Sequence, residues 1–219
     1  MEPDIRIVWR QLSAEEKKQY FLDYYLGKVL IALAALVLAG YTACAVMTPD
    51  PSPLLRIGFY DTALSEETRT DLIQTIQGIL HTDEEIILDD AFSSLRDDDL
   101  VRITALSQAK ELDAIIADRD VFEWLSGYSC FSDVTMICDA SFLKEFQDDI
   151  IECRGLAVGE NGLLIEGGEG NGEWYSAGIS LVHTELADAV PQMKEPVLGL
   201  IDTSLKTEQL EQILLKLKR

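Results

Sequence analysis

The sequence predicts an α/β domain with a mostly parallel sheet and flanking helices, preceded by one apolar helix. Short apolar runs alternate with amphipathic segments from residue 54 onward. Two Asn-Gly pairs, at 161–162 and 171–172, are typical of tight hairpin turns and predict a β-hairpin excursion. An uncharged stretch runs for 19 residues from Val29 to Met47. Strands that alternate with helices favour βαβ units, in which a parallel sheet is covered on both faces.

Residues 28–47 predict a single transmembrane helix. At about 1.5 Å per residue, the uncharged run would span roughly 28 Å, close to the ~30 Å hydrocarbon core of a bilayer. It has no amphipathic stripe, which suits a lipid environment. The basic residues near the uncharged run all lie on its N-terminal side: Arg6, Arg10, Lys17, Lys18 and Lys28. This bias predicts a cytoplasmic N-terminus, a single-pass protein of the cell membrane and an extracellular C-terminal domain.

The expected divisions are a cytoplasmic tail (1–27), the transmembrane helix (28–47), a linker (48–53) and an extracytoplasmic α/β domain (54–219). Two alternatives concern processing: Ala43-Cys44-Ala45 has the pattern of a signal-peptidase site, and Cys44 could carry a lipid after cleavage. The long preceding tail favours an uncleaved anchor. In that tail, Ser13 and Glu16 form a capping box that predicts a helix from residue 14. Aromatic residues at 20–25 indicate an interfacial belt or, alternatively, a docking surface.

The first half of the outer domain alternates regularly. The predicted strands are Leu54–Tyr60, Glu85–Leu88 and Leu112–Ala117, and the predicted helices are 66–79 with Ser65 as its cap, Asp97–Lys110 and Val121–Leu125. Leu112–Ala117 is almost entirely apolar, so we expect a central strand buried on both faces. Crossover connections between parallel strands then predict the core order 2-1-3.

The second half is less regular. We expect a helix at Ser141–Ile151, an antiparallel excursion at 154–182, a short helix at Glu185–Val190, a closing strand at Pro196–Ile201 and a final amphipathic helix at Thr207–Lys218. About 170 residues are enough for one domain with a full core and hardly enough for two.

Charge excludes some partners. The chain has a net charge of −21, and residues 48–219 hold 34 acidic and 13 basic side chains. Such a surface repels nucleic acid, so no nucleic-acid partner is expected. No CxxC pair occurs among Cys130, Cys138 and Cys153. A Cys130–Cys138 disulfide is one alternative, but we favour three free thiols.

No recognisable catalytic motif supports an enzyme. His81 and His183 stand beside no nucleophile motif, and there is no Gly-x-Ser-x-Gly. The glycine-rich residues 167–172 lack the Gly-Lys-Ser/Thr of a phosphate loop. Neither a cofactor nor a metal is predicted: Asp61-Thr-Ala-Leu-Ser65 lacks a hydroxyl that an Asp-x-Ser-x-Ser metal site requires.

Acidic side chains follow the three predicted parallel strands. Asp61 and Thr62 follow the first, Asp89 the second, and Asp118 and Arg119 the third. Ligands of parallel sheets gather outside the carboxyl ends of strands, so these five residues could bind a cation or an amine-bearing solute. The alternative is that each aspartate caps the next helix. Six aromatic residues could line a cleft or fill the core: Phe92, Trp124, Tyr128, Phe131, Trp174 and Tyr175.

The stretch ELDAIIADRDVFEWLSGYSCFSDV (Glu111–Val134) resembles extracellular solute-binding proteins of ATP-driven importers, as does EPVLGLIDTSLKTEQLEQILLKL near the C-terminal end. LSAEEKKQYFLDYYLGKVLIALAALVLAGY resembles uncharacterised single-pass membrane proteins of Gram-positive bacteria. These resemblances imply one periplasmic-binding-protein-like lobe, half of a full two-lobed protein. They imply a membrane-anchored solute-binding or sensing module with an unknown ligand, beside a transporter or other membrane complex. The alternative is a structural or interaction subunit that has lost its ligand site.

Overall fold

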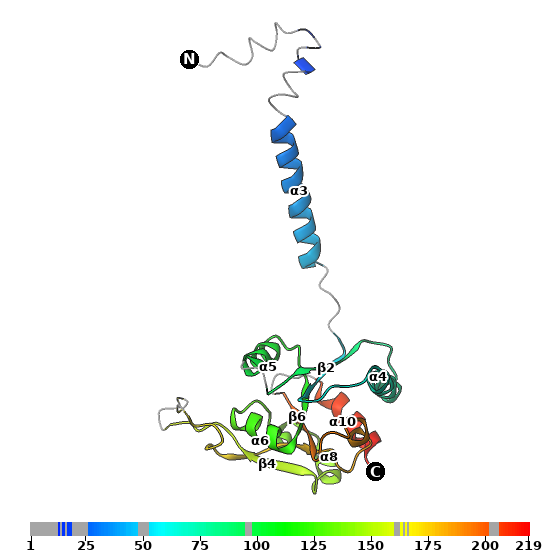
Figure 1. The fold of residues 1–219 in the computed structure, drawn as a ribbon, viewed down its shortest axis with the longest axis vertical. Coiled ribbons are helices and arrows are strands. Elements are labelled where there is room, and N and C mark those ends of the chain that lie inside the picture. Colours follow the sequence, from blue (N-terminus) through cyan, green and yellow to red (C-terminus); the bar gives the residue numbers. More distant parts are fainter. Residues whose placement is uncertain are drawn as a thin grey trace. The chain divides into compact units, whose positions relative to one another are not determined.

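In the computed structural model the chain divides into two compact units, Met1–Ser52 and Pro53–Arg219 (Figure 1). The structure describes residues 13, 15, 17–18, 26–47, 53–94, 98–159, 163, 165, 167–201 and 206–219, with side chains only as far as Tyr41 within 26–47. The aromatic residues at 20–25, the Asn-Gly pair at 161–162 and the side chain of Cys44 lie outside this description. In the tail, the Lys17 N–H donates to the Ser13 carbonyl (3.0 Å).

The N-terminal unit contains α3, a helix from Leu26 to Met47 whose large apolar side chains are exposed. Among the residues that the structure describes, no helix combines the length and the apolar character needed to cross a membrane. This finding contradicts the predicted transmembrane helix, and with it the single-pass topology and the cell-membrane location with a cytoplasmic N-terminus.

The second unit is built on a mixed six-stranded sheet with the order β2-β1-β3-β6-β5-β4. The strands are β1 (Leu55–Tyr60), β2 (Ile86–Phe92), β3 (Ala114–Asp118), β4 (Ile150–Arg154), β5 (Trp174–Ser180) and β6 (Pro196–Leu200). β1 pairs in parallel with both β2 and β3, while the β3–β6, β6–β5 and β5–β4 pairs are antiparallel. Four strands (β1, β2, β3 and β5) therefore run in one direction. The first three strands lie in the order β2-β1-β3. The order of the whole sheet differs from the predicted 2-1-3 core, because β6 follows β3 in the opposite direction.

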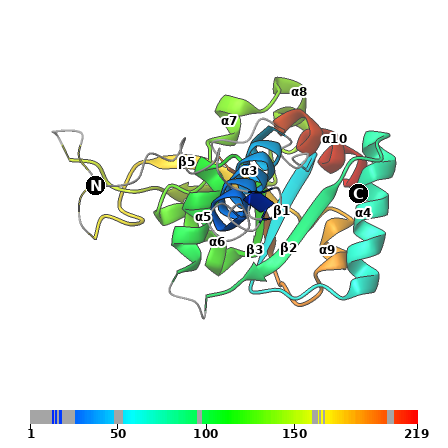
Figure 2. The same cartoon turned by 90° about the horizontal axis from the view of Figure 1, so that it is seen from above.

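Helices cover both faces of this sheet (Figure 2). They are α4 (Glu66–Leu80), α5 (Asp99–Gln108), α6 (Arg119–Gly127), α7 (Val134–Ile137), α8 (Ala140–Glu145), α9 (Leu186–Ala189) and α10 (Thr207–Leu217). Alternate residues of β3 enter different cores, since Ala114 and Ile116 pack with α4 and α10, and Ile115 with α5 and α6. β3, with four buried residues between β1 and β6, is thus the central strand that its apolar sequence predicts.

Two elements differ from their sequence predictions. β2 does not end before Asp89 but continues through Asp89 and Asp90 to Phe92. The helix predicted at Ser141–Ile151 is wrong in its second half, because α8 ends at Glu145 and Ile150 begins strand β4. Pairing with β5 supplies the hydrogen bonds that make this segment a strand, and no local pattern encodes that long-range contact.

Candidate functional site

Asp61 connects the ends of β1 and β2. Its backbone is in the left-handed region (φ 52°). One carboxylate oxygen accepts hydrogen bonds from the Ser94 N–H (2.8 Å) and the Ser93 hydroxyl (3.0 Å). Thr62 is buried beside it. Asp61 therefore anchors the loop after β2, and Ser65 caps α4.

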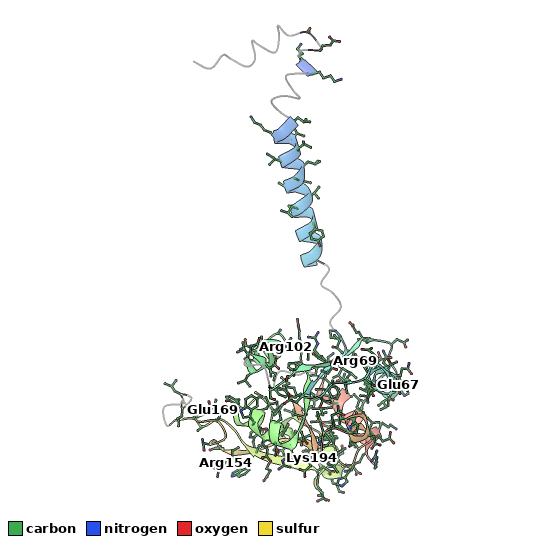
Figure 3. The ribbon with its side chains drawn as sticks, viewed as in Figure 1. Glu67, Arg69, Arg102, Arg154, Glu169 and Lys194 are labelled. Atoms are coloured by element: carbon green, nitrogen blue, oxygen red, sulfur yellow. The ribbon has the colours of Figure 1, made fainter. Side chains whose placement is uncertain are left out.

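Asp89 lies within β2 and forms an ion pair with Arg102 (2.7 Å). Its other oxygen accepts a hydrogen bond from the Ala91 N–H (3.1 Å). The Arg102 guanidinium also lies over the Phe92 ring, 4.3 Å from its centroid. Figure 3 shows Arg102 above the sheet in the second unit. Because this carboxylate already has a basic partner, its charge is largely balanced within the protein.

Asp118 and Arg119 stand at the end of β3. The register that pairs Phe59 with Ile116 places Asp61 and Asp118 on adjacent strand ends. Asp118 nevertheless accepts a hydrogen bond from the Glu195 N–H (2.8 Å), and Arg119 forms an ion pair with Glu123 on its own helix. Asp118 occupies the N-cap position of α6 without making a side-chain capping bond. Each of the three predicted acidic residues thus has its own protein partner.

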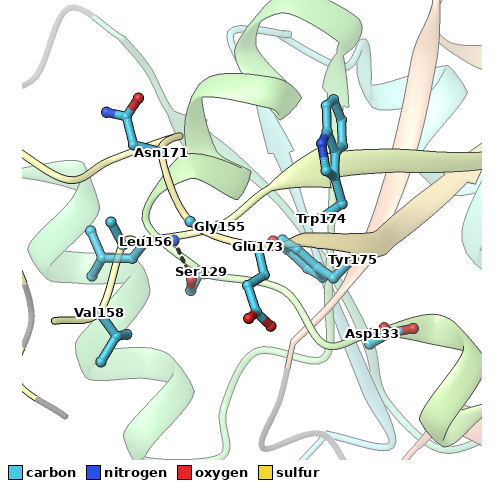
Figure 4. A pocket seen from close by; sticks show the side chains of 11 residues that line it. Ser129, Asp133, Gly155, Leu156, Val158, Asn171, Glu173, Trp174 and Tyr175 are labelled. Carbon is cyan, nitrogen blue, oxygen red and sulfur yellow. Dashed lines mark hydrogen bonds between the residues drawn. The ribbon is translucent and has the colours of Figure 1, made fainter. Parts of the chain in front are cut away.

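A different part of the domain contains a hollow of about 730 Å³. It lies between the turn after α6 and the segment that joins β4 to β5 (Figure 4). Its lining residues are Ser129, Asp133, Gly155, Leu156, Ala157, Val158, Asn171, Gly172, Glu173, Trp174 and Tyr175. The volume is within the range of roughly 300–1,000 Å³ that is typical of small-molecule sites.

The walls of this hollow differ in character. Leu156 and Val158 form an apolar side, and Val158 is 56% exposed. Glu173 and Tyr175 come from the opposite side, while the Trp174 indole points to the other side of the strand (Figure 4). The Tyr175 hydroxyl donates to the Ser126 carbonyl (3.1 Å), which fixes the ring. Burial raises the pKa of this phenol well above its ordinary value, so it stays neutral at physiological pH.

Close backbone contacts form the base of the hollow. The Gly155 N–H donates to the Glu173 carbonyl (3.1 Å), and the Gly172 N–H donates to the Gly155 carbonyl (2.9 Å). A Cβ at Gly172 would lie 2.5 Å from the Leu156 carbonyl oxygen, closer than any real contact. The Leu156 N–H donates to the Ser129 hydroxyl (2.9 Å), which ties the base to the turn after α6. The shape of the hollow therefore depends on glycine at position 172.

The charge of the hollow is negative. Asp133 is half-buried and accepts a hydrogen bond from the Thr135 N–H (2.9 Å) as the N-cap of α7. Within the described residues, the Glu173 carboxylate makes no ion pair, and its side chain is exposed. The lining includes neither lysine nor arginine. Two carboxylates without a basic counterpart favour a cationic ligand.

The three cysteines whose side chains the structure describes are in the reduced form. Cys130, Cys138 and Cys153 are free thiols. Burial raises the pKa of Cys130 to about 11 and that of Cys138 to about 12, so both stay protonated and unreactive at neutral pH. Across the described ranges, no group of three or more His, Cys, Asp and Glu side chains could hold a metal ion.

Comparison with protein-family models, with curated proteins and with solved structures gives no match for this chain. The candidate site therefore stands on its own geometry. Of its side chains, the sequence indicated Trp174 and Tyr175 as possible cleft residues. Asp133 and Glu173 were not predicted, although Glu173 directly follows the Asn171-Gly172 turn signal.

Proposed function

We propose that the protein is a binding or sensing module that takes up a small amine-bearing solute in the hollow between the turn after α6 and residues 155–175. The observation that carries the proposal is a hollow of about 730 Å³ whose charged side chains are both carboxylates, Asp133 and Glu173. The net charge of −21 adds a long-range attraction for cations. The resemblance of Glu111–Val134 to solute-binding proteins is consistent with this use.

The walls indicate what such a solute should look like. An ammonium or guanidinium group would sit near Glu173, where a charge-assisted hydrogen bond stabilises a complex by about 1.5–3 kcal/mol. Asp133, whose carboxylate caps α7, would add to the negative potential of the hollow. The remainder should be small and partly apolar, because Leu156, Val158 and the Tyr175 ring form the rest of the wall. A cation above the Tyr175 ring would gain a further ~0.5–2 kcal/mol. Lysine, arginine and short polyamines have these properties and carry a net positive charge or, as free amino acids, a cationic side chain.

The test is thermal unfolding of the protein with lysine, arginine, putrescine and spermidine, with glutamate and leucine as controls that carry no net positive charge. A ligand at 100 times its Kd stabilises the folded state by about 2.7 kcal/mol, which a change in Tm reports. We expect stabilisation by at least one cationic solute and none by glutamate. Stabilisation by none of the cations, or equally by leucine, would overturn the proposal.

A pair of variants locates the binding. E173Q removes a carboxylate from the hollow, and we expect it to weaken binding at least tenfold. E169Q makes the same charge change on the same segment, outside the lining, and should retain binding. If E169Q weakens binding as much as E173Q, the attraction is a general effect of charge and the hollow is not the site.

A further inference from the structure

β4 is the last strand of the sheet, and one of its edges is open. The strand order ends with β4, whose only strand neighbour in the described sheet is β5. The Asp149 carbonyl accepts from the Ser180 N–H (2.7 Å), and the Gly155 N–H donates to the Glu173 carbonyl (3.1 Å). The backbone groups of Asp149 and Gly155, just before and just after β4, therefore point toward β5.

The residues between them alternate. The irregularity in the β4–β5 register pairs Ile151 with Gly178 but Glu152 with Ser176, so the extra residue belongs to β5 and β4 itself is regular. Since successive residues of an antiparallel strand point their N–H and C=O groups to opposite sides, Ile150, Glu152 and Arg154 direct theirs away from β5. These are the groups with which a further strand would pair.

Two hollows, of about 490 and 310 Å³, lie beside β4 and share Arg119, Glu152 and Trp174. Their linings together include all five residues of β4. Arg119 comes from the start of α6, and the Trp174 side chain is 62% exposed. Figure 1 shows β4 along the margin of the second unit.

We propose that the open edge of β4 is a docking site for an extended, basic segment of another protein, which adds a strand beside Ile150–Arg154. This surface shares Trp174 with the lining of the proposed solute site, but the proposal does not depend on that site. The partner would pair its backbone with the outward groups of Ile150, Glu152 and Arg154. It would place a lysine or arginine beside Glu152, an exposed carboxylate without an ion pair in the described residues.

The net charge favours a basic partner over a second copy. The chain carries −21, which attracts a basic segment and repels another copy of itself. Of the two arginines at this edge, Arg119 is paired with Glu123 and Arg154 lies over the Trp174 ring.

The experiment uses the full 219-residue chain and a synthetic ten-residue peptide of alternating lysine and valine. Amide hydrogen exchange is measured with and without the peptide. We expect the amides of Ile150, Glu152 and Arg154 to exchange at least tenfold more slowly with the peptide, while those of Ile151 and Cys153 change little. A peptide of alternating glutamate and valine should give no protection.

Three results would overturn the proposal. The first is unchanged exchange at the three amides in millimolar lysine–valine peptide. The second is equal protection by the glutamate–valine peptide, which would exclude the basic partner. The third is a dimer in solution, without peptide, whose β4 amides are already protected, which would make a second copy the occupant.

Variants separate backbone pairing from charge. E152P removes the outward N–H and should abolish protection, whereas E152Q keeps that N–H and should weaken peptide binding by only a few-fold. E173Q, which alters the proposed solute site, should leave the peptide effect unchanged. If E152P unfolds the protein, the exchange measurement on the unmodified chain still decides the question.

Discussion

Two glycines on neighbouring strands make room for a stacked pair of phenylalanine rings. The rings of Phe122 and Phe131 lie 4.6 Å apart at an interplanar angle of 9°. The β5–β6 register continues from Ile179–Leu198 to Gly178 opposite Gly199. A Cβ at Gly199 would lie 2.4 Å from the Phe131 ring and 2.7 Å from that of Phe122. The sheet can carry this aromatic pair only because these positions have no side chain.

G199A should therefore destabilise the protein. Overpacking of this kind costs about 1–3 kcal/mol, and the ring contacts leave little space for relaxation. The control is G78A, within α4, where a Cβ meets nothing within 4 Å. Alanine there should stabilise by about 0.4–1 kcal/mol, because it restricts the unfolded chain and favours the helix. Urea unfolding of both variants measures the two free energies, and effects of equal sign would contradict this account.

Asp90 predicts a specific dependence of stability on pH. Its pKa is affected most by desolvation, which raises it, but hydrogen bonds from the Leu64 N–H (2.9 Å) and the Arg69 guanidinium bring the net pKa below its ordinary value. A carboxylate with a lowered folded-state pKa contributes stability above its unfolded pKa of about 3.9. That contribution is lost as the pH falls through the lower, folded value.

D90N should thus lower the free energy of unfolding at pH 7. The difference from the unmodified protein should stay constant down to about pH 5 and shrink below about pH 4, as the native Asp90 becomes protonated. D120N, which changes an exposed aspartate in the first turn of α6, is the control. Urea unfolding between pH 3 and pH 7 measures both; a D90N effect that grows on acidification would contradict the assignment.

At the scale of elements, we expect the strands to differ in local stability. β3 lies between β1 and β6, and Ala114–Ala117 are fully buried. β4 pairs on one side only. Amides of Ile115 and Ile116 should therefore exchange only through global unfolding, while those of Glu152 and Arg154 should exchange orders of magnitude faster. Hydrogen exchange of the unliganded protein tests this order, and strong protection of Glu152 without a partner would contradict it.

The sequence predicts the elements with strong local signals and misses those that depend on distant contacts. Ser65 and the apolar spacing after it define α4 closely, and apolar β3 is recognisable as a central strand. The predicted helix extends into the first two residues of β4 because Phe142, Phe146 and Ile150 follow a helical spacing, although the last of these already belongs to the strand. β2 continues through two aspartates since Arg69 and Arg102 balance their charges, a compensation visible only in three dimensions.

The proposed solute site was beyond sequence reasoning for the same reason. Its two carboxylates, Asp133 and Glu173, are 40 residues apart and line one hollow because the strand pair β4–β5 folds back beside the turn after α6. Neither belongs to a motif. The acidic residues at the strand ends were predicted because ligands often bind outside the carboxyl ends of parallel strands. In the structure each of them has a partner within the protein, as Asp118 has in the Glu195 N–H.

At the scale of the whole molecule, the net charge of −21 should make stability depend on salt. Repulsion among acidic side chains opposes the compact state, and the described ion pairs offset it only locally. The Debye length falls from about 30 Å at 0.01 M to about 8 Å at 0.15 M ionic strength, so added salt screens this repulsion. We expect Tm to rise between 0.01 M and 0.2 M NaCl and then to level off, because the repulsion is by then largely screened. A specific effect of the ions would instead keep growing with their concentration. An equivalent osmolality of sorbitol is the control for excluded-solute effects, which screen no charge. A Tm that falls over the same range would mean that attractive ion pairs outweigh the repulsion, contrary to what the excess of acidic side chains predicts.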